Sequence, residues 1–229
     1  ILKDVSVTIP DRTTTAVIGP SGSGKTTLCS LIARFWYVDS GSIRIGGTDI
    51  REYTLESLMD QISMVFQNVY LFADTIENNI KFGSPDADHE QVVAAAKKAC
   101  CHDFISALPD GYDTVIGEGG ATLSGGEKQR ISIARAMLKN APIIIFDEAT
   151  ANVDPENEDK LQKAMEELMR DKTILMIAHR LKTVQKADQI LVLDEGQVVQ
   201  KGTHEELRDT PGIYRDFLEV RKEAAGWKL

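Results

Sequence analysis

A run of residues near the start of the chain has the types and spacing of a phosphate-binding loop. It fits the pattern G-x-x-x-x-G-K-[ST] and consists of Gly19, Pro20, Ser21, Gly22, Ser23, Gly24, Lys25, Thr26 and Thr27. Glycines let successive backbone N–H groups turn inward around a phosphate, and a following helix adds the positive end of its dipole. In this pattern the lysine reaches the β- and γ-phosphates of a nucleotide, and the hydroxyl of Thr26 ligates Mg²⁺.

A pair of acids follows the most apolar run of the chain. Asp147 and Glu148 come directly after residues 142–146. Acids at the end of a buried strand are costly unless they bind a cation or take part in chemistry. Beside a phosphate loop, they predict that Asp147 holds Mg²⁺ and that Glu148 acts as the general base that polarises the attacking water. The competing interpretation is an acid pair that caps the next turn.

The sequence Ser124-Gly125-Gly126-Glu127 has two interpretations that do not exclude each other. As S-x-x-E it is a capping box, the ordinary start of a helix. As Ser-Gly-Gly at a helix N-terminus it is also an anion site that a ligand can approach closely. The chain therefore has a second helix N-terminus of the phosphate-binding type.

The elements that must position these residues alternate between strands and helices. Strands are expected at 4–9, 15–18, 43–45, 62–66, 142–147 and 173–178, with a hairpin of 189–193 and 197–201. Helices are expected at 26–35, 54–59, 88–98, 103–108, 124–139, 155–170, 203–208 and 212–225. This order predicts an α/β fold, a P-loop NTPase core with a mainly parallel sheet, a small antiparallel β region and an inserted α-helical lobe. Ligands of such folds bind at the carboxyl ends of strands, where Gln67, Asp147, Glu148 and His179 fall.

The bulk properties exclude several classes of protein. No apolar run approaches the roughly 18 residues that a membrane span needs. The net charge of −9 argues against a nucleic-acid-binding surface, which is usually basic. The 3 cysteines are odd in number and imply no disulfide framework, so a reducing cytosolic setting fits best. A first strand at residue 4 with nothing before it suggests a fragment of a longer polypeptide.

The octapeptide at 123–130, LSGGEKQR, resembles the signature motif of ABC ATPases. The phosphate loop, Gln67, the strand at 143–148, Asp154 and residues 178–180 stand in the order and spacing of the nucleotide-binding domain of ABC transporters. Residues 69–80 and 117–120 are similar to the exporter branch in particular. The resemblance implies one domain over 1–229, with a core of 1–67 and 140–229 and a helical lobe of about 68–139.

The resemblance further implies an Mg²⁺-dependent ATPase whose hydrolysis of ATP is coupled to transmembrane transport. Two such domains, identical or not, would clamp two ATP molecules head to tail. Ser124, Gly125, Gly126 and Glu127 of one domain would face the phosphate loop of the other, with Asp154 at the seam. Gln67 would contact Mg²⁺ or the attacking water. His179 would hydrogen-bond the γ-phosphate and help to hold Glu148.

The membrane domains would lie upstream and hold this domain at the cytoplasmic side of the membrane. The resemblance implies that they contact the segment Tyr70–Ile80, and Tyr70, Leu71, Phe72 and Ile76 would be costly to leave in water. The aromatic residue on which the family stacks adenine would also lie upstream of Ile1. For the segment Tyr70–Ile80, the alternative interpretation is a solvated loop.

The sequence departs from the family pattern in places. Glu127 replaces the commoner glutamine of the signature, and residues 151–154 replace Ser-Ala-Leu-Asp, which removes a hydroxyl at the seam.

The alternative function is a non-transport ABC-type ATPase that acts on chromosomes or ribosomes. Such proteins usually have a long coiled-coil insertion or a second ATPase domain in tandem. A regulatory domain that binds ATP without hydrolysing it is opposed by Glu148 and His179.

Overall fold

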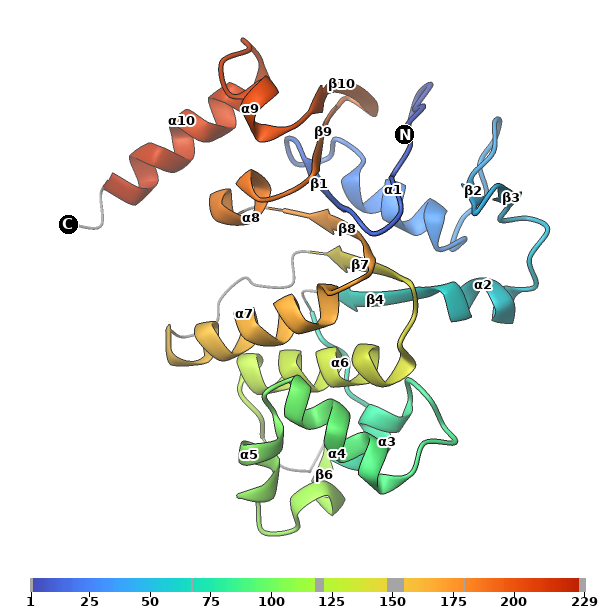
Figure 1. Cartoon of the computed structure of the whole chain (residues 1–229), viewed down its shortest axis with the longest axis vertical. Helices are drawn as coiled ribbons and strands as arrows, with labels where there is room; N and C mark the ends of the chain where they lie inside the picture. Colours follow the sequence, from blue (N-terminus) through green and yellow to red (C-terminus); the bar gives the residue numbers. More distant parts are fainter. Residues whose placement is uncertain (1, 67, 118–121, 148–154, 179, 227–229) are drawn as a thin grey trace. The chain divides into compact units, whose positions relative to one another are not determined.

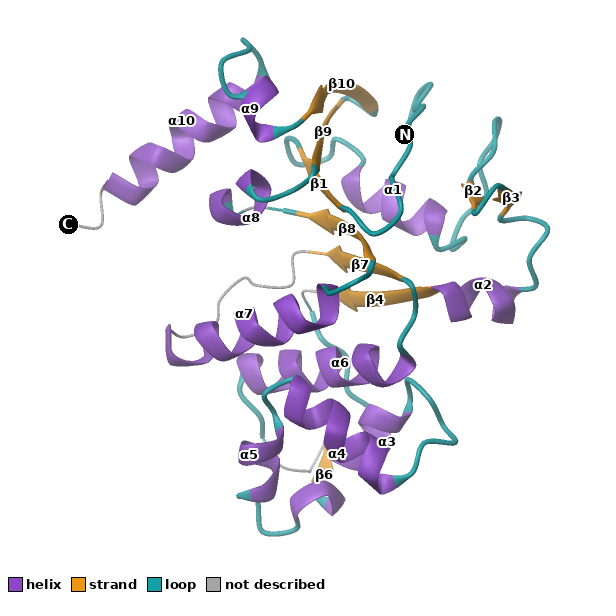
Figure 2. Ribbon diagram, in the orientation of Figure 1, coloured by secondary structure: helices purple, strands orange, loops and turns teal. Residues whose placement is uncertain are grey.

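The computed structural model describes residues 2–66, 68–117, 122–147, 155–178 and 180–226 (Figure 1). The chain divides into two compact units, one formed by Ile1–Met59 with Thr173–Leu229 and the other by Asp60–Lys172. Helices and strands alternate along the chain, as the α/β prediction requires (Figure 2). Among the described residues, every helix is too short or too polar to span a membrane.

The first unit is built on strands in the order β10-β9-β1-β8. Strand β1 (Thr14–Ile18) pairs in parallel with β8 (Thr173–Ile177) on one side and with β9 (Gln189–Asp194) on the other. Strand β10 (Gln197–Gly202) pairs antiparallel to β9 and closes the expected hairpin. Residues Thr15 to Ile18 of β1 are all buried, as expected for a central parallel strand whose two faces are both covered, and this accounts for its continuous apolar sequence.

The remaining elements near these strands are mostly helices. They are α1 (Lys25–Ile32), α2 (Leu55–Gln61), α8 (Leu181–Gln185), α9 (His204–Leu207) and α10 (Ile213–Gly226), with a short hairpin of β2 (Arg44–Ile45) and β3 (Thr48–Asp49). The expected helix starts at 54 and 203 are confirmed by their caps. Thr54 accepts the backbone N–H of Ser57 before α2, and Thr203 forms a capping box with Glu206 before α9.

The strand expected at 4–9 is wrong, because the described residues 2–10 contain no strand. The alternation that suggested it is real, since Val5, Val7 and Ile9 are partly buried while Ser6 and Thr8 are exposed. The backbone contacts are isolated: Lys3 N–H donates to Gly196 O at 2.8 Å, and Gln189 Nε2 donates to Thr8 O at 3.1 Å. A strand needs a ladder of backbone hydrogen bonds, which alternating burial does not supply.

The second unit combines a pair of parallel strands with the helices that follow them. Strands β4 (Ile62–Phe66) and β7 (Ile143–Asp147) pair in register from Ile62 with Ile143 to Phe66 with Asp147. The helices are α3 (Ile76–Lys81), α4 (His89–Lys98), α5 (His102–Ser106), α6 (Gly125–Lys139) and α7 (Pro155–Met169), with a small antiparallel sheet of β5 (Asp74–Thr75) and β6 (Val115–Ile116). Helix α6 contacts α3, α4, α7 and β4 and is the centre of this unit (Figure 1).

The longer predicted elements of this unit are confirmed, and so is the short helix α5, which was expected at 103–108. Helix α4 begins after Asp88, which caps it as predicted for the helix at 88–98, and the structure adds a capping box with Gln91. Helix α3 and the strands β5 and β6 were not predicted, because they are too short to show an apolar period. Helix α8 of the first unit was missed for the same reason, whereas β2 falls within the strand expected at 43–45. The division into a core and a lobe at 68–139 stays a prediction.

Candidate nucleotide-binding site

The phosphate loop joins β1 to α1 and needs glycine at two of its positions. Gly19 has φ +148°, and a Cβ there would overlap the carbonyl oxygen of Leu193. Gly24 has φ +102° as the N-cap of α1, and a Cβ there would lie 2.6 Å from Cδ2 of Leu2. A larger residue at Gly19 would push against the backbone of β9, so the shape of the loop depends on the absent side chain.

The side chain of Lys25 folds back over this loop. Its Nζ donates to the carbonyl oxygens of Gly19 at 2.9 Å and Pro20 at 2.8 Å, and it lies 3.5 Å from Ser23 Oγ. Lys25 is 9 % exposed, which is unusual for lysine. The backbone of Ser23 is fixed in turn, because its carbonyl accepts the N–H of Gly196 at 3.2 Å. The ammonium charge is therefore held against a rigid loop.

Helix α1 begins at Lys25 with the donors of its first turn facing the loop. Within the part of the chain that the structure describes, no side chain caps this helix. Helix N-termini have backbone N–H groups without intrahelical partners, and these attract anions. Thr26 lies in this first turn with an exposed side chain, so its hydroxyl is accessible to a metal ion beside the loop.

Strand β8 runs beside the strand that leads into the loop. The N–H of Ala178 donates to Val17 O at 3.1 Å. Ala178 directly precedes His179 in the sequence. Among the residues predicted for the site, Gln67, Glu148, Asp154 and His179 lie outside the described residues.

The second unit brings the ends of β4 and β7 together. Phe66 and Asp147 are partners in the parallel register and are the last residues of their strands. Gln67 and Glu148 are the next residues in the sequence after them. Asp147 is partly buried, as expected for a carboxylate at the end of an apolar strand. The expected meeting of strand ends is thus observed for this pair of strands.

The signature segment forms the predicted capping box at the start of α6. The N–H of Ser124 donates to Glu127 Oε2 at 2.8 Å, and the N–H of Glu127 donates to Ser124 Oγ at 3.3 Å. The glutamate that replaces the family's glutamine therefore satisfies the same backbone donor. Ser124 and Gly125 are exposed, whereas Gly126 is buried. The exposed pair can be approached by a ligand from outside the chain.

Gln129 is a buried polar residue of α6 that lies within the signature octapeptide at 123–130 but was given no role of its own. It is 4 % exposed, and its Nε2 donates to the carbonyl oxygen of Phe66 at 3.2 Å. It lies on the same stripe of the helix as the buried residues Ile133 and Ala136. A glutamine on an apolar stripe signals a buried amide that needs a partner, and this signal could have identified it.

An exposed aromatic patch, formed by Tyr70, Phe72 and Phe82, lies on the second unit. Tyr70 is 72 % exposed and Phe82 is 62 % exposed. The guanidinium of Arg135 lies 5.6 Å from the ring centroid of Phe72 and 5.5 Å from that of Phe82. Arg135 also donates to Asn79 O at 2.8 Å, and burial lowers its pKa. Phe82 lies outside the segment Tyr70–Ile80 and was missed.

The segment Tyr70–Ile80, which carries part of this patch, is folded around the buried side-chain amide of Asn79. Asn79 is 1 % exposed, accepts the N–H of Phe72 at 2.9 Å and donates to Phe72 O at 3.1 Å. Ile76 differs from Tyr70 and Phe72 in the exposure of its side chain. Ile76, the first residue of α3, is fully buried. It therefore belongs to the core and not to an exposed surface.

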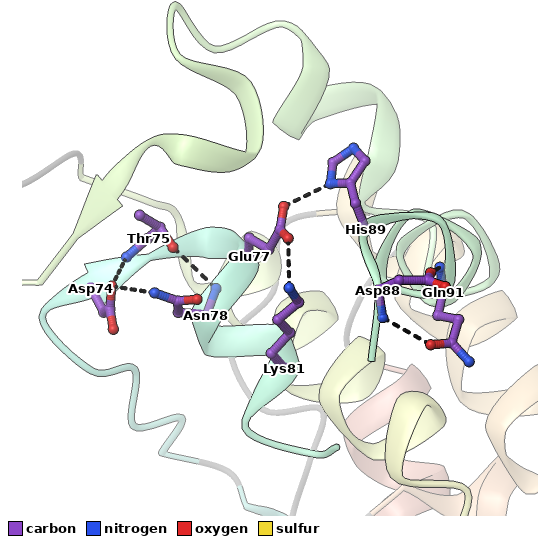
Figure 3. Close-up of polar contacts among 8 residues, drawn as sticks. All are labelled: Asp74, Thr75, Glu77, Asn78, Lys81, Asp88, His89 and Gln91. Carbon is purple, nitrogen blue, oxygen red and sulfur yellow. Dashed lines mark hydrogen bonds and ion pairs between the residues drawn. The ribbon is translucent and has the colours of Figure 1, made fainter. Parts of the chain in front are cut away.

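Polar contacts fix the start of α3 and join it to α4 (Figure 3). Asp74 Oδ1 accepts the N–H of Thr75 at 2.7 Å and Nδ2 of Asn78 at 2.9 Å, and the hydrogen bonds from Asn78 and Thr75 lower its pKa. Burial alone would raise the pKa of Glu77. Hydrogen bonds from His89 and Lys81 outweigh burial and lower the pKa overall.

The polar contacts of Glu77 span two helices. The carboxylate lies 2.7 Å from His89 Nδ1 of α4 and 3.0 Å from Lys81 Nζ of its own helix (Figure 3). The segment that includes the exposed aromatic patch is therefore tied to the neighbouring helix.

Comparison with known proteins identifies the same family that the phosphate loop and the signature segment resemble. The family model described as ABC transporter matches residues 2–151. The ATP-dependent lipid A-core flippase of Legionella pneumophila (strain Paris) is 50 % identical over 222 residues, which are 97 % of this chain and 38 % of the flippase. The YgaD protein of Bacillus subtilis (strain 168), whose name describes multidrug export, is 48 % identical over 221 residues, 96 % of this chain and 38 % of that protein.

A solved structure shares both the fold and much of the sequence. It is the structure of a bacterial Atm1-family ABC exporter with ATP bound, at a TM-score of 0.89 and 42 % identity, covering 96 % of this chain and 39 % of the exporter chain. The chain thus spans about two fifths of the length of these relatives. None of the relatives named above is described as acting on chromosomes or ribosomes, so that alternative has no support among them. The chain belongs to the ABC transporter family and is a nucleotide-binding domain of the exporter type.

Proposed function

We propose that this chain binds and hydrolyses ATP and thereby powers an exporter-type membrane transporter of which it is one part. The observation that carries the proposal is the glycine loop between β1 and α1, over which Lys25 Nζ is held by the carbonyls of Gly19 and Pro20. Phosphate oxygens would attract the same ammonium group and the N–H groups of the loop. Residues Gly19–Thr27 form the phosphate-binding part of the site.

The proposed Mg²⁺ ligands are oxygen donors, which Mg²⁺ prefers. They are the hydroxyl of Thr26, the side chain of Gln67 and the carboxylate of Asp147. Two described features fit this role: Thr26 is exposed in the first turn of α1, and Asp147 ends β7 with its side chain partly buried. Mg²⁺, when bound with ATP, would neutralise charge on the phosphates.

The proposed chemistry is attack of water on the γ-phosphorus. Glu148 would accept a proton from this water, and Gln67 would orient it. His179 would donate a hydrogen bond to the γ-phosphate and hold Glu148 in place. The register of Phe66 with Asp147 supports this assignment, because it makes Gln67 and Glu148 the next residues after two paired strand ends.

The complete site is proposed to need two copies of the domain, identical or paralogous. Ser124, Gly125, Gly126 and Glu127 would face the ATP bound to the partner, with Asp154 at the seam. Support comes from Ser124 and Gly125, which are exposed at the N-terminus of α6. The capping box of this helix forms while both residues stay exposed. An ATP between the two copies would close the dimer.

Membrane domains are proposed to contact the segment Tyr70–Ile80 and to hold the chain at the cytoplasmic side of the membrane. The exposed aromatic patch supports this contact, because exposed rings clustered in one place mark interaction surfaces. The length of the relatives beyond the matched part provides room for such domains.

The test is the substitution Glu148→Gln in the complete purified protein. The variant should bind ATP and accumulate an ATP-bound dimer, with phosphate release slowed about 10²- to 10⁴-fold. Asp159→Asn, which removes an exposed acid of α7, should leave the rate unchanged and is the control. Wild-type protein that releases no phosphate would contradict the ATPase, and a Glu148→Gln variant at the wild-type rate would contradict the general base.

A further inference from the structure

Helix α6 is anchored to β4 by side-chain donors at two places. At the carboxyl end of the strand, Gln129 Nε2 donates to Phe66 O at 3.2 Å. At its start, Lys139 Nζ donates to Ile62 O at 2.9 Å. These residues stand more than two turns apart on one continuous helix, and each bonds a backbone carbonyl. The helix and the strand are therefore joined along their length.

The carbonyl of Phe66, unlike that of Ile62, adjoins a residue proposed for the site, Gln67. It belongs to the peptide bond whose nitrogen is that of Gln67. A hydrogen bond to this carbonyl restrains the rotation of that peptide plane. Arg135 adds a contact on the other flank, since its Nη1 donates to Tyr70 O at 3.3 Å. Donors from α6 thus bind the backbone before and after position 67.

The start of the same helix carries the signature residues. The capping box of Ser124 and Glu127 lies in the first turn, and Gln129 lies in the second. An α-helix transmits a displacement of its first turn to the second because its backbone hydrogen bonds link them. A ligand that moves Ser124 and Gly125 therefore moves the donor that holds Phe66 O.

We propose that Gln129 is a positioning residue for ATP hydrolysis. It fixes the backbone from which Gln67 extends, and it links that backbone to the signature end of α6. The inference rests on the proposed function, in which the signature meets the partner's ATP and Gln67 meets the water or metal ion of its own ATP. The bond would make alignment of Gln67 depend on engagement of the partner's nucleotide.

The first test compares Gln129→Met with Lys139→Met in the complete protein. Both changes keep an unbranched side chain and remove a donor to a carbonyl of β4. Loss of the Gln129 bond should lower kcat about tenfold and leave KM for ATP within about twofold, because the phosphate loop belongs to the other unit of the chain. Lys139→Met should lower the melting temperature without changing kcat. A merely structural role of Gln129 would make the two variants alike, and that result would overturn the proposal.

Gln129→Lys provides the conservative variant and covers the case in which the methionine variant does not fold. It keeps a donor of similar reach, as Lys139 demonstrates for Ile62 O on the same helix. Its kcat should stay within about threefold of wild type. A folded lysine variant with a kcat tenfold or more below wild type would contradict a role based on donation to Phe66 O.

A double-mutant cycle with Gln67→Ala tests whether Gln129 acts through Gln67. Residues that act through one group are not additive, so Gln129→Met should cause no further loss of kcat in the Gln67→Ala background. Additive losses would overturn the proposal while the ATPase itself stands. Wild-type protein without phosphate release would instead overturn the proposed function and this role together, so the two failures are distinguishable.

Discussion

The ammonium group of Lys25 donates a hydrogen bond to the carbonyl oxygen of Gly19 at 2.9 Å, which joins the lysine of the phosphate loop to its first glycine. Gly19 in turn lies so close to Leu193 O that no Cβ fits between them. The position of the charge is therefore set by the backbone of β9 and not by the loop alone. Phosphate oxygens would bind an ammonium group that is already in place.

Substitution of Lys25 by methionine should weaken ATP binding about 10- to 100-fold, as expected for loss of one or more hydrogen bonds from a charged donor. Equilibrium binding of a fluorescent ATP analogue measures this. Lys97→Met, which removes an exposed lysine of α4, should bind as wild type does. Equal affinities of the two variants would show that Lys25 does not contact the nucleotide.

Replacement of Gly19 by alanine should destabilise the fold by at least about 3 kcal/mol, because strain at positive φ adds to overlap with backbone. The matched control is Gly41→Ala, since Gly41 has φ +81° with nothing near its missing Cβ. Strain alone predicts a cost of about 1–2 kcal/mol there. Urea unfolding monitored by circular dichroism compares them, and equal costs would contradict the close approach to Leu193.

Gly125→Asp should separate folding from dimer formation. A Cβ added at Gly125 would meet no atom of the described residues within 4 Å, and an acid in the first turn of a helix is stabilising. The melting temperature should stay at or above that of wild type, while ATP hydrolysis falls at least about tenfold because the charge would repel the partner's phosphates. Gly125→Ala, which adds no charge, should lose less activity. Full activity of the aspartate variant would contradict the proposed contact with the partner's ATP.

Phe82→Ser should uncouple ATP hydrolysis from transport in the complete protein. Phe82 is 62 % exposed, so its truncation should cost the isolated fold less than about 1 kcal/mol. ATP affinity should be unchanged, while stimulation of hydrolysis by transported substrate falls. Val115→Ser removes an apolar side chain that is 54 % exposed on the same unit and should behave as wild type does. Identical stimulation in both variants would argue against the patch as the docking surface.

Glu77 should contribute to stability only above its pKa. Its pKa is lowered from the usual 4.5, so the contribution is complete above about pH 4.5 and is lost as the pH falls through the lower value. Glu77→Gln should cost up to about 1 kcal/mol at pH 7 and little at about pH 2, measured by urea unfolding. Asp86→Asn, an exposed acid between α3 and α4, is the control. A cost of Glu77→Gln that persists at low pH would contradict the ion pair with Lys81 and the hydrogen bond with His89 as the source of this stability.

Local motifs explain why much of this protein was predictable from its sequence. The phosphate loop and the capping boxes at Asp88, Ser124 and Thr203 depend on residues within a few positions of one another. Their hydrogen bonds therefore follow from spacing alone. The apolar strands at 62–66 and 143–147 were equally clear, because strands buried on both faces have continuous apolar sequences.

The tertiary structure decided what depends on partners far away in the sequence. It placed β1 between β8 and β9, and it left residues 2–10 without the ladder that their alternation suggested. It also turned Ile76 inward and joined Gln129 to Phe66, which are 63 positions apart. Spacing along the chain specifies contacts within a turn or a helix. A contact between distant segments depends on how strands and helices pack, and that packing is set by the burial of the whole unit.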